Sequence, residues 1–158
     1  MNNHLLDRLA EDTACAPARA VKDEAPGGCE NILFVEDERF VREVACEVLR
    51  EAGYQVWSAR CGADAVRTFN ELCGQVDLLL TDVVLPGKTG LALANDLRQH
   101  RPDLAVLVIS GYLQHLASDD FRRNGHCLAK PFSAGSLLRK VRDVLDGRAE
   151  GERRAVLI

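Results

Sequence analysis

Acidic side chains follow two apolar segments of this sequence, at the points where strands would end. Glu36 and Asp37 come directly after residues 31–35, and Asp82 closely follows the apolar residues 78–80. A carboxylate beside a buried strand loses hydration free energy unless a cation or a hydrogen-bond donor pairs with it. The chemistry of these positions therefore depends on which groups the rest of the fold brings to them.

A hydroxyl and an amine follow two later apolar segments. Ser110 comes after residues 104–109, and Lys130 comes after residues 126–129. In an open parallel sheet, ligands bind at the carboxyl ends of the strands. We therefore expect three acids, one hydroxyl and one lysine to share a single rim.

The elements that position these residues alternate along the chain. Short apolar runs predict strands at 31–35, 54–59, 76–81, 104–109 and 126–129. Apolar residues at helical spacing predict helices at 40–49, 62–72, 89–100, 112–122 and from the Ser133 cap to Leu145. This alternation favours a parallel sheet. We expect a flavodoxin-like, doubly wound α/β fold, with five parallel strands in the order 2-1-3-4-5 and helices on both faces.

That strand order would group the rim residues. The first and third strands would be neighbours, roughly 4.8 Å apart, so Asp37 and Asp82 would face each other. Carboxylates this close repel and favour a bound cation, and oxygen ligands suit a hard ion, Mg²⁺ above all. Ser110 would lie one strand beyond Asp82. Lys130 would lie two strands beyond it, roughly 10 Å away and within reach of its long side chain. This environment would neutralise a phosphoryl group at Asp82.

Four motifs at these strand ends resemble the receiver domain of two-component response regulators, including stand-alone receivers and those attached to hybrid histidine kinases. They are FVEDE at 34–38, LTDVVLPG at 80–87, ISGY at 109–112 and LAKPF at 128–132. A single acidic pair would be a weak signal. Four motifs in matching order and spacing, over residues 31–146, are a specific one.

The resemblance implies a role for each rim residue. Asp82 would accept a phosphoryl group from a histidine kinase or a histidine phosphotransfer protein, as a mixed anhydride. Mg²⁺ would be held by Asp37, Asp82 and the backbone carbonyl of Val84, with Glu36 assisting through a water. Lys130 would pair with a phosphoryl oxygen. The chain would then be a signalling protein that catalyses only its own phosphorylation and dephosphorylation.

The switch residues depart from the family pattern. The resemblance implies that Ser110 hydrogen-bonds a phosphoryl oxygen and carries the switch. It also implies a cis peptide bond between Lys130 and Pro131. The usual Tyr or Phe three residues before Lys130 is replaced by Cys127. A thiol cannot move the same apolar area, so either the switch is weaker or Tyr112 supplies the aromatic ring.

Two positions predict a slow loss of the phosphoryl group. Val84 lies two residues after Asp82, and Tyr112 lies two residues after Ser110. In the family, these places influence hydrolysis of the acyl phosphate. Val84 has no polar atom to orient an attacking water, and Tyr112 is bulky. We therefore expect a comparatively long-lived aspartyl phosphate.

Composition predicts the organisation of the chain and its partners. We expect a flexible N-terminal extension at 1–29, a receiver domain at 30–146 and a charged C-terminal tail at 147–158. The formal net charge is -4, and no basic patch, helix-turn-helix or second globular pattern follows residue 146. We therefore expect no direct binding of nucleic acid. Output would run through a downstream protein bound to the face of the fourth helix, fifth strand and fifth helix.

Targeting and metal-binding patterns are sparse. No apolar run approaches the roughly 18–20 residues that cross a bilayer, and the N-terminus lacks the pattern of a secretory signal, so we expect a cytoplasmic protein without a membrane partner. The six cysteines and four histidines show no zinc spacing.

Other interpretations of the acidic residues stay open. Glu36, Asp37 and Glu38 would also suit a helix N-terminus favoured by the macrodipole. A phosphatase of the haloacid dehalogenase type uses an aspartyl nucleophile with Mg²⁺, but it needs DxD after its first strand. A flavin-binding flavodoxin needs a phosphate loop where this chain has acids. A degenerate receiver would bind partners without being phosphorylated, and the retained acids, Ser110 and Lys130 argue against that.

Overall fold

The structure, a computed structural model, describes residues 26–111 and 126–155. In these ranges the chain forms a parallel sheet of five strands in the order β2-β1-β3-β6-β7. The strands are β1 (Asn31–Val35), β2 (Gln55–Ala59), β3 (Leu78–Asp82), β6 (Ala105–Ser110) and β7 (Cys127–Ala129). Strands β6 and β7 are the fourth and fifth strands of the predicted sheet, because β4 and β5 belong to a separate pair. The predicted doubly wound fold and its strand order 2-1-3-4-5 are therefore confirmed.

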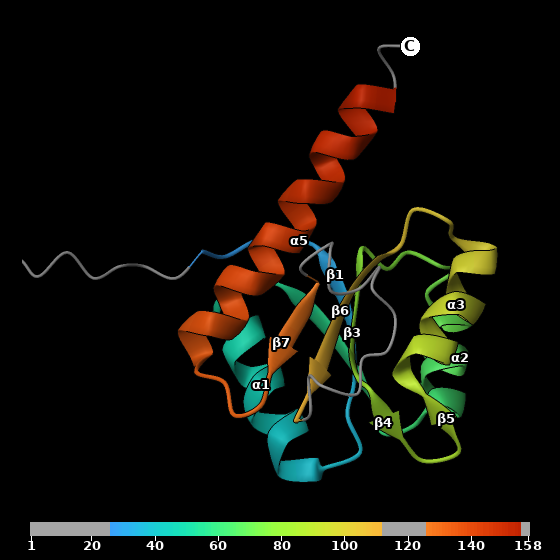
Figure 1. Cartoon of the computed structure of the whole chain (residues 1–158), viewed down its shortest axis with the longest axis vertical. Coiled ribbons are helices and arrows are strands. Elements are labelled where there is room, and N and C mark those ends of the chain that lie inside the picture. The colour runs from blue at the N-terminus through green and yellow to red at the C-terminus, as the bar shows by residue number, and fades with distance from the viewer. Residues whose placement is uncertain (1–25, 112–125, 156–158) are drawn as a thin grey trace, which may run out of the picture.

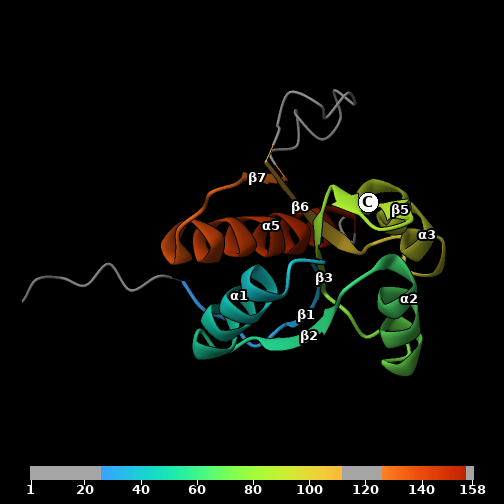
Figure 2. The ribbon, with the colours of Figure 1, turned by 90° about the horizontal axis from the view of Figure 1, so that it is seen from below.

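Helices cover both faces of this sheet (Figures 1 and 2). In the described ranges they are α1 (Arg39–Glu51), α2 (Gly62–Glu71), α3 (Gly90–His100) and α5 (Ala134–Ala155). Viewed from below, α1 and α5 lie on one side of the sheet, and α2 and α3 lie on the other. The helix predicted at 112–122, with Tyr112, falls outside the described residues.

The alternation of strand side chains builds two apolar layers. Ile32 and Phe34 of β1 pack in the cluster formed with α1 and α5, whereas Leu33 and Val35 pack in the cluster formed with α2 and α3. Successive strand residues point to opposite faces, and both faces of a parallel sheet are covered. This explains why the strands are continuous apolar runs rather than alternating ones.

A short hairpin that the sequence patterns did not predict follows β3. Strands β4 (Val84–Leu85) and β5 (Lys88–Thr89) pair antiparallel across Pro86 and Gly87, and Gly87 adopts a φ of 78°. Thr89 then begins α3, because its side-chain oxygen accepts a hydrogen bond from the backbone N–H of Ala92 at 3.2 Å. The hairpin therefore leads the chain from the end of β3 into α3.

The close approach of Gly90 to β3 fixes this connection beside the rim. A Cβ at Gly90 would overlap the carbonyl oxygen of Asp82 and the side chain of Thr81. The Gly90 N–H also donates to the carbonyl of Val83 at 2.9 Å. Only glycine allows the start of α3 to pack this closely on the last two residues of β3.

The last helix is longer than predicted. Ser133 caps it as expected, with the Ser136 N–H donating to Ser133 Oγ at 3.2 Å, but α5 continues to Ala155. The domain boundary placed at residue 146 thus lies inside a helix and stays a prediction. Within the described part of the chain, no helix has both the length and the apolar character to cross a membrane.

Candidate functional site

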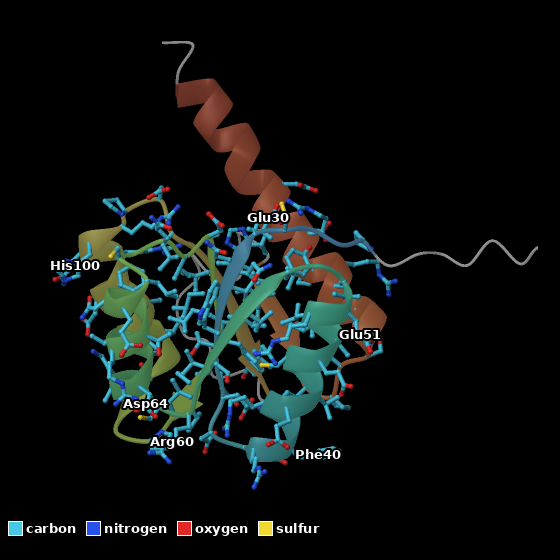
Figure 3. The ribbon with its side chains drawn as sticks, turned by 180° about the vertical axis from the view of Figure 1, so that it is seen from behind. Glu30, Phe40, Glu51, Arg60, Asp64 and His100 are labelled. Carbon is cyan, nitrogen blue, oxygen red and sulfur yellow. The ribbon has the colours of Figure 1, made fainter. Side chains whose placement is uncertain are left out.

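Three carboxylates meet at the carboxyl end of the sheet. Oxygen atoms of Glu36, Asp37 and Asp82 all lie within 4.8 Å of one another. The cause is the register of β1 and β3, in which Val35 pairs with Thr81, so Glu36, which follows β1, lies beside Asp82, the last residue of β3. In Figure 3, the labelled Phe40 and Arg60 mark this end of the molecule.

Lys130 reaches this cluster from the edge strand β7. Its Nζ donates to Asp82 Oδ2 at 2.5 Å and to Glu36 Oε2 at 2.8 Å. Its backbone N–H donates to the carbonyl of Ser110 at 2.9 Å, which ties the end of β7 to β6. The peptide bond between Lys130 and Pro131 is cis, as the family resemblance implied. The lysine thus crosses β6 to contact the last residue of β3 and the first residue after β1.

The charge of Lys130 is favoured by these contacts. Burial opposes the charged form, but hydrogen bonds to Asp82 and Glu36, together with their negative charges, outweigh it and raise the pKa of Lys130 above its ordinary value. The ammonium therefore keeps its proton at neutral pH. It supplies a fixed positive charge beside the two carboxylates.

Glu36 is the buried member of the acidic cluster. It is fully inaccessible to solvent, and this burial raises the pKa of its carboxyl group despite the hydrogen bonds from Lys130 and from the Glu38 N–H. The second of these bonds joins Glu38 N to Glu36 Oε1 at 3.1 Å. The family resemblance implied a role for Glu36 through a water, whereas the direct ion pair of Glu36 with Lys130 was not predicted from the sequence.

Both oxygens of the Asp82 carboxylate have hydrogen-bond donors. Oδ2 accepts from Lys130, and Oδ1 accepts from the backbone N–H of Val84 at 3.1 Å. The side chain of Val84 itself is 74% exposed. These contacts orient Asp82 toward the rim, next to the turn into the β4–β5 hairpin.

The expected switch residues are placed unevenly. Ser110 is buried at the end of β6, one residue beyond the partner of Asp82 in the β3–β6 register. Cys127 is half-buried on β7, opposite Val108, and burial raises the pKa of its thiol. Tyr112 lies outside the described residues, so its part in the switch stays a prediction.

The chemistry of the donor set suits a hard divalent cation. Three carboxylates lie close together, and one ammonium, that of Lys130, pairs with two of them, so the carboxylates outnumber the paired cation. Carboxylate oxygens are the ligands that Mg²⁺ prefers, whereas the cluster has no thiolate or imidazole to favour a softer metal. The residues present therefore fit the Mg²⁺ that the sequence analysis expected.

Two further features beside the rim were not found from sequence. The guanidinium of Arg42 contacts the backbone of the Glu36–Asp37 turn. An apolar groove of about 450 Å³ also opens next to Lys130, between the first turns of α1 and the residues that follow β7. Phe40 and Val44 line it while being 72% and 44% exposed. The available signal for this groove was the apolar stripe of the helix predicted at 40–49, which includes Phe40 and Val44.

Sequence comparisons give a consistent picture. The family model of the response regulator receiver domain matches residues 32–142. The chain is 34% identical to the sensor kinase CckA of Brucella abortus over 151 residues, which cover 90% of this chain and 16% of CckA. It is 31% identical to the response regulator receiver protein CpdR of the same organism, over 73% of this chain and 97% of CpdR. The chain thus spans about a sixth of CckA and nearly all of CpdR.

Solved structures agree in fold. The receiver domain of the hybrid histidine kinase CckA superposes with a TM-score of 0.62 at 36% identity, covering 73% of this chain and 98% of that domain. The response regulator protein TrrA of Thermotoga maritima, in complex with Mg²⁺ and BeF, superposes with a TM-score of 0.64 at 29% identity and the same coverage.

Proposed function

This chain belongs to the response regulator receiver domain family of two-component systems, and on that premise we propose that it accepts a phosphoryl group on Asp82. The donor is a phosphohistidine on a histidine kinase or a histidine phosphotransfer protein. The observation that carries this proposal is the position of Lys130, whose ammonium contacts the carboxylates of Asp82 and Glu36 together. An acceptor acid paired with a fixed cation is the arrangement that phosphoryl transfer requires.

In the proposed reaction, a carboxylate oxygen of Asp82 attacks the phosphorus of phosphohistidine. The new O–P bond forms an acyl phosphate, the N–P bond breaks, and the electron pair of that bond leaves with the imidazole. Catalysis of phosphoryl transfer rests mainly on positioning and on charge stabilisation. The hydrogen bond from Val84 N–H orients the acceptor, and Lys130 neutralises charge on a phosphoryl oxygen.

Asp37, Asp82 and the backbone carbonyl of Val84 would hold Mg²⁺ in this proposal, with Glu36 assisting through a water. The bound ion supplies positive charge opposite the phosphoryl oxygens. The direct pairing of Glu36 with Lys130 adds a second task for this acid, because it aims the ammonium at Asp82. Support comes from the mutual approach of the three carboxylates.

We propose that Ser110 hydrogen-bonds the phosphoryl group and transmits its presence to the rest of the domain. This residue is buried at the end of β6, next to the strand that ends in Asp82, and its carbonyl is joined to Lys130. A rearrangement at Ser110 would reach β7 and α5, which belong to the proposed output face together with the helix predicted at 112–122. Cys127 on β7 takes the place of the usual aromatic ring. A downstream protein, not nucleic acid, binds this face.

The apolar groove beside Lys130 is where we place the phosphodonor protein. Phe40 and Val44 of α1 and Phe132 after β7 line the groove together with Lys130 itself. A partner whose helix packs on these side chains would bring its phosphohistidine next to Asp82. The exposure of Phe40, an apolar side chain without cover in the described structure, favours a partner at this place.

Incubation with Mg²⁺ and a small phosphodonor tests the proposal. Intact-mass measurement should find one added phosphoryl group in the wild type and none in Asp82→Asn. Asp143→Asn, at an exposed position on α5, is the matched control and should be modified like the wild type. Modification of Asp82→Asn to the wild-type level would reject Asp82 as the acceptor. An unmodified wild type would favour a binding module, and rapid hydrolysis of small phosphate esters would favour a phosphatase.

A further inference from the structure

The turn that carries Glu36 and Asp37 is held from the side by one guanidinium. Nη1 of Arg42 donates to the carbonyl oxygen of Glu36 at 2.6 Å and to that of Asp37 at 3.2 Å. Arg42 itself is partly buried in the first turns of α1. A single side chain therefore contacts the backbone of two of the three acids in the cluster.

These two carbonyls need a donor because of where the chain leaves the sheet. The register of β1 with both of its neighbours ends at Val35, so the carbonyls of Glu36 and Asp37 lie beyond the ladder. The bond from Arg42 to the Glu36 carbonyl is partly buried, and backbone carbonyls that are partly withdrawn from water are normally hydrogen-bonded. Arg42 supplies these hydrogen bonds from α1, the helix that the turn leads into. Its backbone N–H also donates to the carbonyl oxygen of Glu38 at 3.0 Å.

We infer that Arg42 is a positioning residue for divalent cation binding, an inference that rests on the proposed function. It holds the backbone of the turn so that the carboxylates of Glu36 and Asp37 face Asp82. Its guanidinium bonds to main-chain oxygens, so the acidic side chains stay available to one another and to a cation. The residue acts through the acids and contacts no phosphoryl group.

Removal of Arg42 should change the Mg²⁺ affinity in opposite directions according to whether Arg42 acts as a charge or as a positioning residue. If Arg42 mattered only as a positive charge near the acids, its removal would strengthen Mg²⁺ binding, because one repulsive charge would be gone. If Arg42 positions the turn, its removal weakens Mg²⁺ binding. Partners that orient metal ligands are typically worth roughly 10–100-fold in metal affinity.

Calorimetric titration of Mg²⁺ into the unphosphorylated protein separates these cases. Arg42→Met should weaken Mg²⁺ binding by roughly 10-fold, the lower end of that range. Arg42→Lys should recover part of the loss, since an ammonium keeps donors but lacks the planar fork. Arg39→Met is the matched control: it removes an equal charge from the same helix, where Arg39 is exposed and pairs with Glu43. It should not weaken Mg²⁺ binding.

The phosphorylation kinetics give a second readout. With a small phosphodonor, Arg42→Met should need more Mg²⁺ for half-maximal rate, while its rate at saturating Mg²⁺ returns toward that of the wild type. Unchanged or tighter Mg²⁺ binding by Arg42→Met overturns the inference, even if urea denaturation shows lower stability. If Arg42→Met does not fold, Arg42→Lys decides: a wild-type affinity contradicts the inference, and a smaller but measurable loss supports it.

These outcomes are distinct from failure of the proposed function. A wild type that is phosphorylated with Mg²⁺, beside an Arg42→Met variant of equal Mg²⁺ affinity, rejects the positioning role alone. A wild type that binds Mg²⁺ but gains no phosphoryl group rejects the proposed function and leaves the effect of Arg42 on Mg²⁺ affinity to be read independently.

Discussion

Lys130 Nζ lies 2.5 Å from Asp82 Oδ2, although the two residues are 48 positions apart in the sequence. The strand β6 lies between the strands that deliver them. The contact therefore depends on the order of the whole sheet, and it joins the proposed acceptor to the cation that would stabilise its phosphorylated state.

Replacement of Lys130 by methionine should slow phosphorylation of Asp82 by roughly 100-fold or more, because a donor aimed at developing charge is lost. The rate of phosphoryl incorporation from a small phosphodonor at saturating Mg²⁺ measures this. Lys140→Met, on α5, is the control and should retain the wild-type rate. Equal rates for Lys130→Met and the wild type would remove the lysine from the mechanism.

Glu36 should give the protein a distinct dependence of stability on pH. Burial raises the pKa of Glu36 above 4.5, so the folded state binds the proton more tightly than the unfolded state. The contribution of this group is fully present below pH 4.5 and is lost as the pH rises through the raised folded pKa. Without divalent cations, the wild type should therefore lose stability relative to Glu36→Gln over that range. Urea denaturation of both proteins at a series of pH values checks this, and a wild type that gains stability relative to Glu36→Gln as the pH rises would contradict it.

The exposed ring of Phe40 should matter for protein donors only. Phe40→Ser should lower the rate of phosphotransfer from a histidine kinase or phosphotransfer protein several-fold, since it removes an apolar contact at the groove. Its rate with a small phosphodonor should be unchanged, because Phe40 is 72% exposed and contributes little to the core. Glu47→Ser, exposed on α1 and absent from the groove lining, serves as the control. Equal losses with both donors would show that the substitution damages the acceptor site itself.

Val84 should set a long lifetime for the acyl phosphate. Its side chain is exposed beside Asp82 and offers no polar atom to a water. Val84→Asn should therefore shorten the lifetime, because an amide can orient the attacking water. Decay of the phosphorylated protein after a chelator quench gives both lifetimes. A wild-type lifetime of seconds, or one that Val84→Asn leaves unaltered, would count against this account.

The sequence was sufficient for the fold because the strands are continuous apolar runs with polar residues at their carboxyl ends. The position of Lys130 within reach of Asp82 then followed from strand order and strand spacing. The hairpin of β4 and β5 could not be predicted in this way, since its strands of two residues are too short to carry a pattern. The end of α5 was also missed, because the apolar stripe on which the prediction rested stops at Leu145.

The individual contacts of the site residues could not be predicted from the sequence either. The bonds from Arg42 to Glu36 and Asp37 depend on the path of the turn after β1 and on the direction of one long side chain. The pairing of Glu36 with Lys130 joins residues 94 positions apart and depends on burial of the acid. Residue type and spacing bring such groups to one rim but do not decide which of them touch.

The central claim is that Asp82, among the three clustered acids, takes the phosphoryl group. Borohydride reduction of the phosphorylated protein converts an aspartyl phosphate to homoserine and a glutamyl phosphate to 2-amino-5-hydroxypentanoic acid, and peptide mass spectrometry can locate either product. The account predicts homoserine at position 82 alone, formed only when Mg²⁺ and a phosphodonor are present. Homoserine at position 37, 2-amino-5-hydroxypentanoic acid at position 36, or no reduced residue at any position under these conditions would contradict it.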